Sequence, residues 1–390
     1  MDEKRLVPEL RFPEFREEWI VRTIDHITSR VGDGIHGTPA YNENGSYYFV
    51  NGNNLENGEI VINDNTKKVT KEEKQKNDRP LNEQTILLSI NGTIGNLAFY
   101  RGENIMLGKS AAYINVASKH EVKFVYNYLS TYKAQSFFKS QLTGSTIKNL
   151  SLKTIRQTKI NLPIDEKEQQ KIATFLTSID ERIQLLEKKK ESLEDYKKGI
   201  MQKIFSQEIR FKDEKGKDFP DWEKKRLEEV LNYEQPTKYL VADTEYKDEY
   251  DIPVLTAGKT FLLGFTNETK GVFRDNLPTI IFDDFTTAFQ FVDFPFKAKS
   301  SAMKMLIPKT KETNMKFIFE AMKTIKFPLA EHKRYWISEY QKEKISYPCI
   351  DEQQKIASFL SSIDESIEQV TQQIEHSKTY KKGLLQKMFV

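Results

Sequence analysis

A block of 38 residues, 168–205, occurs again at 352–389 without a gap, and this duplication limits the possible folds of the chain more than any other pattern in it. The two copies are identical at 21 of the 38 positions. Both open with Glu-Gln-Gln-Lys-Ile-Ala, and both carry Tyr-Lys-Lys-Gly near their ends. Repetition at this level predicts two equivalent structural units, so we expect one scaffold built twice.

Shorter matches extend the duplication toward the start of each half. Residues 9–12 (Glu-Leu-Arg-Phe) correspond to 208–211 (Glu-Ile-Arg-Phe), and Trp19 corresponds to Trp222. The stretches from each tryptophan to the first glutamate of the following block, 19–168 and 222–352, differ in length and share little identity. Matching ends with unlike middles predict a duplicated scaffold that carries two separately specialised modules.

The repeated block has the pattern of a long helix with a coiled-coil seam. In alternating steps of four and three residues from Ile172 and from Ile356, eight of ten positions are apolar in each copy. A sustained period of 3.5 residues is typical of packed long helices, and 38 residues make a rod of roughly 57 Å. We expect the two helices to pack antiparallel through the following seam residues: Ile172, Leu176, Ile179, Ile183, Leu186, Leu193, Ile356, Leu360, Ile363, Ile367, Val370 and Ile374.

The unlike middles have the pattern of mixed α/β domains. Strand-like runs at 46–50, 85–90, 111–116, 279–282 and 303–307 alternate with stretches rich in Gly and Asn, and helical patterns at 122–139 and 315–326 precede the repeated blocks. The predicted fold class is α/β: two mixed α/β domains joined by two long helices packed as an antiparallel coiled coil, with a pseudo-twofold internal repeat. The predicted boundaries are 1–160, 161–207, 208–347 and 348–390.

Composition narrows the class of protein. The chain has 60 basic and 57 acidic residues, so the net charge of +3 gives no global signal for a nucleic-acid partner, although local basic patches are compatible with one. Its single cysteine, Cys349, excludes a disulfide framework, and the five histidines form no metal-ligand spacing. The start of the chain lacks an apolar signal core, and no apolar run approaches the length of a membrane span. We expect a soluble, cytoplasmic protein.

Three motifs suggest cofactor or metal chemistry, but a structural role explains each one better. Residues 32–37 match Gly-x-Gly-x-x-Gly, yet Thr-Pro follows and no βαβ unit surrounds them. Residues 102–110 end in Gly-Lys-Ser like a phosphate loop, but their first glycine is one residue too distant. Asp283 and Asp284 lack a third acidic residue nearby, so a surface turn is the better interpretation. Because no Pro-Pro pair, nucleophile elbow or His-Glu-x-x-His motif occurs either, nothing predicts catalysis by this chain.

Two segments are basic and contain no acidic residue. Residues 139–164 hold five basic side chains, and residues 294–311 hold five lysines. Either segment alone could be an ordinary solvated surface, but one in each half favours contacts with phosphates. The first segment includes the run Leu-Thr-Gly-Ser-Thr-Ile-Lys-Asn-Leu at 142–150.

The arrangement resembles the DNA-specificity (S) subunits of type I restriction-modification systems over essentially the full length. The residues that carry this resemblance are the two helix openings at 165–173 and 351–357, the Leu-Arg-Phe-Pro-Glu-Phe run at 10–15, and the run at 142–150. The second variable stretch lacks a clear copy of the Gly-Ser-Thr loop.

The resemblance implies a function without catalysis by this chain. Each variable stretch would be a target-recognition domain that reads one half of a bipartite double-stranded DNA site, with unlike halves because the two domains differ. The helices would set the spacing and dock two modification (methyltransferase) subunits, and restriction subunits would join the full complex. No cofactor would be bound by this chain, since S-adenosylmethionine, ATP and Mg²⁺ belong to the partner subunits. The DNA-facing candidates are Lys109, Ser110, Gly144, Ser145, Thr146, Lys148, Lys297, Lys299, Ser300 and Lys304.

The aromatic series between 282 and 296 is interpreted as core rather than as a base-stacking surface. The main alternative function is a coiled-coil scaffold that binds other proteins and reads no DNA sequence. Two unlike modules on matched helices are compatible with it.

Overall fold

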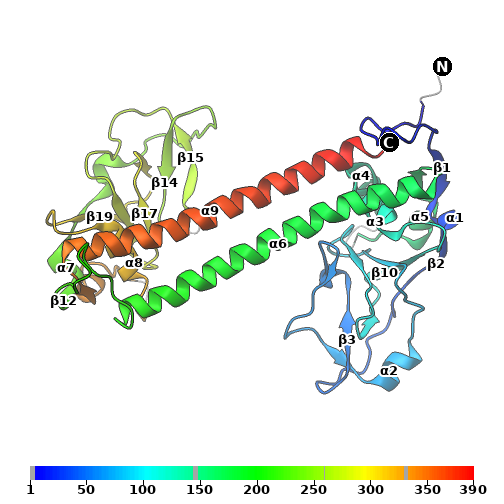
Figure 1. Cartoon of the computed structure of the whole chain (residues 1–390), viewed down its shortest axis with the longest axis horizontal. Coiled ribbons are helices and arrows are strands. Elements are labelled where there is room, and N and C mark those ends of the chain that lie inside the picture. The colour runs from blue at the N-terminus through cyan, green and yellow to red at the C-terminus, as the bar shows by residue number, and fades with distance from the viewer. Residues whose placement is uncertain (1–4, 144–147, 259, 329–332) are drawn as a thin grey trace. The chain divides into compact units, whose positions relative to one another are not determined.

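The computed structural model describes residues 5–143, 148–258, 260–328 and 333–390. Its contacts divide the chain into two compact units: unit 1 is Met1–Glu187 with Thr371–Val390, and unit 2 is Lys188–Val370. Each unit therefore contains part of both long helices, α6 (Glu166–Phe205) and α9 (Ile350–Lys387) (Figure 1). The boundaries predicted from the sequence assign each helix to a segment of its own, so the contacts divide the chain differently.

Unit 1 is built around a four-stranded antiparallel sheet in the order β2-β10-β7-β8. The bounds of these strands are β2 Thr28–Asp33, β7 Thr85–Ser89, β8 Leu97–Phe99 and β10 Ala111–Val116. The remaining strands are β1 Ile20–Thr23, β3 Tyr47–Val50, β4 Leu55–Glu56, β5 Glu59–Ile60, β6 Lys68–Val69, β9 Ile105–Leu107 and β11 Lys159–Leu162. The helices are α1 Ile24–Ile27, η1 Gly52–Asn54, α2 Lys71–Lys76, α3 Val122–Ser130, α4 Tyr132–Ser140 and α5 Leu152–Gln157. Every residue of β7 and β10 is buried, as expected for central strands covered on both faces.

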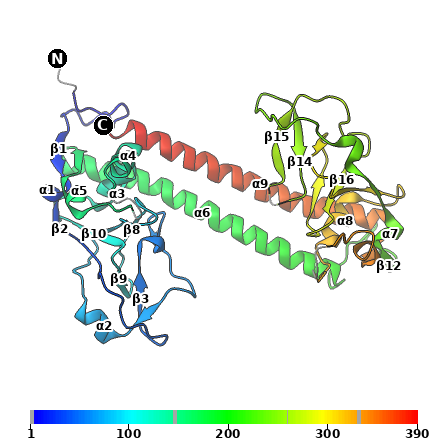
Figure 2. The same cartoon turned by 180° about the vertical axis from the view of Figure 1, so that it is seen from behind.

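Unit 2 has its own four-stranded antiparallel sheet in the order β13-β19-β16-β17. Its strand β16 is labelled in Figure 2, near helix α8. The bounds of these strands are β13 Leu231–Glu234, β16 Thr279–Asp283, β17 Phe289–Val292 and β19 Met303–Pro308. The other elements are β12 Glu223–Arg226, α7 Leu227–Val230, η2 Pro236–Tyr239, β14 Ile252–Leu255, β15 Leu262–Thr266, β18 Lys297–Ala298, α8 Met315–Met322, η3 Tyr340–Lys342 and β20 Lys344–Tyr347.

The two variable stretches share one topology although their sequences do not match. The sheet order β2-β10-β7-β8 corresponds to β13-β19-β16-β17. The parallel pair β3 and β9 corresponds to β14 and β18, and the antiparallel pair β1 and β11 corresponds to β12 and β20. The strand order of the middles is therefore duplicated too, although their residue identities are not retained.

One predicted helix is two helices in the structure. The pattern at 122–139 predicted a single helix, but the chain forms α3 and α4 with Thr131 between them. Thr131 has an extended backbone (φ −63°, ψ 151°), and its hydroxyl accepts a hydrogen bond from the backbone N–H of Ala134. A threonine that caps a new helix in this way ends the first one.

The Glu-Gln pair that opens each repeated block anchors its helix to the start of the same unit. In unit 1 the buried Glu168 carboxylate accepts two bonds of 2.7 Å from the guanidinium of Arg11 and one of 3.2 Å from Trp19 Nε1. In unit 2 the buried Glu352 carboxylate accepts bonds of 3.3 and 2.9 Å from Arg210 and one of 2.8 Å from Trp222 Nε1. In each unit, the hydrogen bond to the glutamate raises the pKa of the arginine above its usual value.

The following glutamines complete these anchors. Gln169 donates to the carbonyl of Pro163 and accepts from the backbone N–H of Glu121. Gln353 donates to the carbonyl of Pro348 and accepts from the N–H of Asn314. Both glutamines are buried, so each joins the start of a long helix to the chain just before it and to the residue that caps α3 or α8.

The predicted seam residues are mainly buried. Nine of them are buried: Ile172, Leu176, Ile179, Ile183, Ile356, Leu360, Ile363, Val370 and Ile374. Leu186, Leu193 and Ile367 are half-buried. In unit 1 the first residues of this series share one core with Leu384 near the end of α9 and with Met388 just after it. In unit 2 Ile356, Leu360 and Ile363 share a core with Ile204 from the end of α6.

Candidate nucleic-acid interface

Three loops of unit 1 meet beside the ends of β7 and β10. The backbone N–H of Ile90 donates to the carbonyl of Ser110 at 2.9 Å, and the N–H of Leu150 donates to the carbonyl of Ile90 at 3.0 Å. Asn91 also forms a bridge with Asn149. These bonds place residues 91–95, 108–110 and 148–150 together, and we call this surface the unit 1 loop cluster.

A fourth loop, 51–54, joins the same cluster through polar side chains. Ser110 Oγ accepts from the N–H of Gly52 at 2.9 Å and donates to Asn51 Oδ1 at 2.9 Å, while Thr93 Oγ1 donates to the carbonyl of Gly52 at 2.9 Å. A Cβ on Gly52 would clash with Ser89 Oγ, so this close approach requires glycine. The loops with Asn-Gly and Gly-Lys-Ser sequences thus form one hydrogen-bonded surface.

The structure brings together the predicted candidates of unit 1 that it describes. Lys109 and Lys148 are both exposed in the loop cluster. Ser110 is half-buried and uses its hydroxyl within the domain, so its role is to position the loops. Gly144, Ser145 and Thr146 lie outside the described residues.

Two predicted contacts of unit 2 are wrong. Lys297 is 4% exposed, and its ammonium group lies 2.6 Å from a carboxylate oxygen of Glu268. Lys304 is 1% exposed and lies 3.3 Å from a carboxylate oxygen of the equally buried Asp284. Both lysines neutralise carboxylates inside the domain, so neither ammonium group faces a ligand.

The other two candidates of unit 2 lie at the surface or close to it. Lys299 is exposed, whereas Ser300 is half-buried and accepts from the backbone N–H of Ala302. They follow β18 and lead into β19, the position that residues 108–110 occupy before β10. Lys299 therefore remains a candidate contact, and Ser300 resembles Ser110 in shaping a loop.

Within the aromatic series of unit 2, and within its pair of adjacent aspartates, the side chains differ in burial. Phe282 and Phe296 are buried, as predicted, but Phe285 and Phe294 are each 41% exposed. Asp283 forms the expected turn, with its Oδ1 accepting from two backbone N–H groups at 2.8 Å. Asp284 is buried, contrary to the expected surface position. Among the residues that the structure describes, no cluster of three or more His, Cys, Asp or Glu side chains could hold a metal ion.

The sequence interpretation missed Lys333 and Arg334, which are exposed beside this turn. The backbone N–H of Tyr335 donates to the carbonyl of Asp284 at 2.8 Å, as Leu150 does to Ile90 in unit 1. A signal for them was available, because Lys148 and Lys333 precede the first glutamates of their repeated blocks by nearly the same length of chain.

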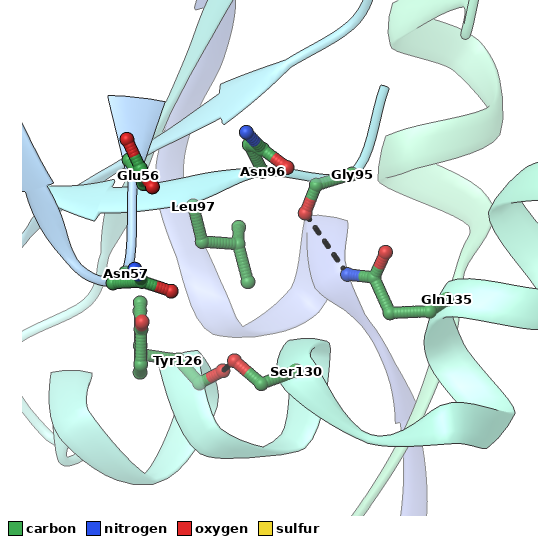
Figure 3. A pocket seen from close by; sticks show the side chains of 8 residues that line it. All are labelled: Glu56, Asn57, Gly95, Asn96, Leu97, Tyr126, Ser130 and Gln135. Carbon is green, nitrogen blue, oxygen red and sulfur yellow. Dashed lines mark hydrogen bonds between the residues drawn. The ribbon is translucent and has the colours of Figure 1, made fainter. Parts of the chain in front are cut away.

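A pocket of about 390 Å³ lies between the β7–β8 loop and helices α3 and α4, lined by the eight residues labelled in Figure 3. Gln135 donates to the carbonyls of Gly95 and Leu129, and Ser130 donates to the carbonyl of Tyr126. Burial raises the pKa of Tyr126 to about 12, so its phenol stays protonated at neutral pH. Since the amide and hydroxyl donors bond to the backbone, we assign this pocket no catalytic role.

No helix in the described ranges has both the length and the apolar character that crossing a bilayer requires.

Known proteins resemble the chain in sequence. A family model for the type I restriction modification DNA specificity domain matches residues 17–195 and 220–376. The specificity subunit of the type I restriction enzyme EcoR124I/EcoR124II from Escherichia coli is 50% identical over 149 residues, which cover 37% of each protein. The MjaVIII specificity subunit of Methanocaldococcus jannaschii is 32% identical over 166 residues, or 41% of this chain and 38% of that protein. The matches thus span well under two thirds of the length of these relatives.

Known structures share the fold. The S subunit of a type I restriction-modification system from M. genitalium superimposes with a TM-score of 0.63 over 98% of this chain and 99% of that chain, at 19% identity. Since the matched family model covers both variable stretches and most of both repeated blocks, the chain belongs to the family of type I restriction modification DNA specificity domains.

Proposed function

We propose that this chain is the DNA sequence-specificity subunit of a type I restriction-modification complex. The observation that carries the proposal is that two domains of one topology present different side chains from corresponding loops. Lys109 and Lys148 lie in the loop cluster of unit 1, and Lys299, Lys333 and Arg334 lie in the corresponding region of unit 2. Each domain would read one half of a bipartite DNA site, and the halves would differ because the loops differ.

In this proposal α6 and α9 pair along their length as an antiparallel coiled coil and set the distance between the two recognition domains. Equivalent ion pairs in the two units support it: Asp180 lies 2.6 Å from Lys381, and Asp364 lies 2.6 Å from Lys197. Because these pairs join equivalent positions of the repeated blocks, they favour a pseudo-twofold relation between the halves, matching two half-sites on a duplex.

Catalysis would belong to partner subunits. The E. coli relative is named as one subunit of a type I restriction enzyme, which supports membership of such a complex. We expect two methyltransferase subunits to dock on the paired helices, with restriction subunits in the full complex. S-adenosylmethionine, ATP and Mg²⁺ would bind to those partners.

The test is base-resolution mapping of adenine methylation in the native host, with and without this gene. Loss of methylation at one bipartite motif after deletion is the expected result, and it would also reveal both half-sites. An unchanged methylome, together with no methyltransferase recovered when the chain is isolated from the host, would favour the alternative of a protein-binding scaffold.

A further inference from the structure

One position in the loop cluster of unit 1 is defined by two backbone hydrogen bonds. Ile90 donates to the carbonyl of Ser110, and Leu150 donates to the carbonyl of Ile90. The residue after Ile90 is Asn91, and the residue before Leu150 is Asn149. The backbones of these two asparagines form an antiparallel β-bridge, and both side-chain oxygens are buried without a hydrogen-bond partner among the described residues.

The same position exists in unit 2 with different chemistry. Asp284 donates to the carbonyl of Ala302 at 3.0 Å, and Tyr335 donates to the carbonyl of Asp284 at 2.8 Å. The residue after Asp284 is Phe285, and the residue before Tyr335 is Arg334. An Asn–Asn pair in unit 1 is therefore replaced by a Phe–Arg pair in unit 2.

The Phe–Arg pair is exposed, and its two side chains lie against each other. Phe285 is 41% exposed, and the guanidinium carbon of Arg334 lies over its ring, 5.9 Å from the centroid. Within the described ranges, no carboxylate lies within ion-pair distance of this guanidinium. A guanidinium stacked on an exposed ring in this way leaves its N–H donors available to a ligand.

Two adjacent aspartates, the half-buried Asp283 and the buried Asp284, hold both residues of the pair in place. Asp283 Oδ1 accepts from the N–H of Phe285, which fixes the turn, and Asp284 Oδ1 accepts from the N–H of Trp336 at 2.8 Å. The second carboxylate oxygen of Asp284 lies 3.3 Å from the buried ammonium of Lys304. The two adjacent aspartates thus join the turn to the segment that carries Arg334 by hydrogen bonds. A recognition surface requires side chains that are held in position by such supporting bonds.

Building on the proposed function, we propose that Phe285 and Arg334 read adjacent base pairs of the second half-site. An arginine fork fits the O6 and N7 acceptors of guanine in the major groove, and an apolar side chain fits the C5-methyl group of thymine. Asn91 and Asn149 hold the same position in the first domain, where both side-chain oxygens are buried and neither residue supplies a guanidinium or an aromatic ring. Side-chain exchange at this one position would thus make the two half-sites unlike.

The experiment uses the full chain expressed with its modification subunits, with the methylated motif of each variant mapped genome-wide. In F285A and in R334A we expect discrimination at one or two adjacent positions of the second half-site to fall by about 5- to 150-fold, with the first half-site unchanged. F294A is the matched control, because Phe294 is also 41% exposed but lies outside the pair. An unaltered second half-site in both F285A and R334A would overturn the inference.

Two further measurements keep the test independent of folding. R334K retains the charge without the fork, so discrimination at the guanine position should fall as it does in R334A, and full retention would overturn the fork assignment. In binding assays, replacing the contacted thymine with uracil removes its methyl group, which should weaken the wild type severalfold and leave F285A unaffected. Equal sensitivity of the two proteins would overturn the methyl contact. If the wild type specified no bipartite motif, the proposed function itself would fail, which is a distinguishable result.

Discussion

Replacing Glu168 with glutamine should loosen the start of α6 from the rest of unit 1. The Glu168 side chain is 2% exposed, and its two carboxylate oxygens each lie 2.7 Å from a nitrogen of Arg11, whose side chain is 10% exposed. Trp19 Nε1 donates to the same carboxylate at 3.2 Å. Glutamine has nearly the same size, but it removes the negative charge and turns an NH₂ group toward the guanidinium or the indole N–H.

The expected cost follows from this burial. Breaking a buried ion pair by removing one partner costs about 3–5 kcal/mol, and a single hydrogen bond to a charged group contributes about 1.5–3 kcal/mol. Because Arg11 keeps some access to water and glutamine retains one acceptor, we expect E168Q to lose about 2–4 kcal/mol of stability in unit 1. That loss corresponds to local opening about 30- to 1,000-fold more frequent.

Hydrogen exchange of backbone amides measures this opening unit by unit. Exchange in β1 and β11 should accelerate in E168Q, whereas β12 and β20 should be unaffected. E352Q is the matched control, since Glu352 makes the equivalent bonds to Arg210 and Trp222, and it should show the reverse pattern. Exchange in β1 and β11 within threefold of wild type would refute the assignment of Glu168 as a structural anchor.

Three further changes separate DNA contacts from structural charges. K148A should weaken binding to the first half-site and reduce the salt dependence of affinity by about one phosphate contact; an unchanged salt titration would remove Lys148 from the interface. K304M should cost about 3–5 kcal/mol of stability in denaturant unfolding, because Asp284 would stay buried without its cation; normal stability with lost DNA binding would contradict this. Burial acts to raise the pKa of Asp364, but its bond to Lys197 and nearby lysines outweigh it and lower that pKa. The ionised Asp364 therefore stabilises the folded protein fully above the pKa that this carboxyl has in the unfolded chain, and the stabilisation is lost as the pH falls through its lower pKa in the folded protein. Below about pH 4 the free energy of unfolding should thus fall more steeply in the wild type than in D364N.

Local patterns predicted several elements of the fold correctly. The seam series from Ile172 to Ile183 and from Ile356 to Ile363 is buried, because a 3.5-residue apolar period leaves a long helix only one face to bury. The fully buried run 111–116 coincides with β10, and 303–307 lies within β19. Such elements depend on neighbours a few residues away, which the linear order of residues contains.

Two candidate contacts were misplaced, because a lysine has the same charge in a sequence whether it is solvated or paired. Lys297 is neutralised by Glu268 and Lys304 by Asp284, and each acidic partner comes from a different strand or loop. Arg334 was overlooked because its relation to Phe285 exists only after the turn and the later segment are hydrogen-bonded side by side.

Repetition and periodicity are visible in the linear order of residues, and they were enough to predict two equivalent halves, a long amphipathic helix at the end of each, and unlike stretches between. Folding in three dimensions was needed to show that the unlike stretches share one topology, and that Asn91 with Asn149 and Phe285 with Arg334 occupy the same place in it. A sheet order is maintained by burial and backbone hydrogen bonds, which many side-chain sequences can satisfy. A recognition surface is different, because it depends on which distant loops those bonds bring together.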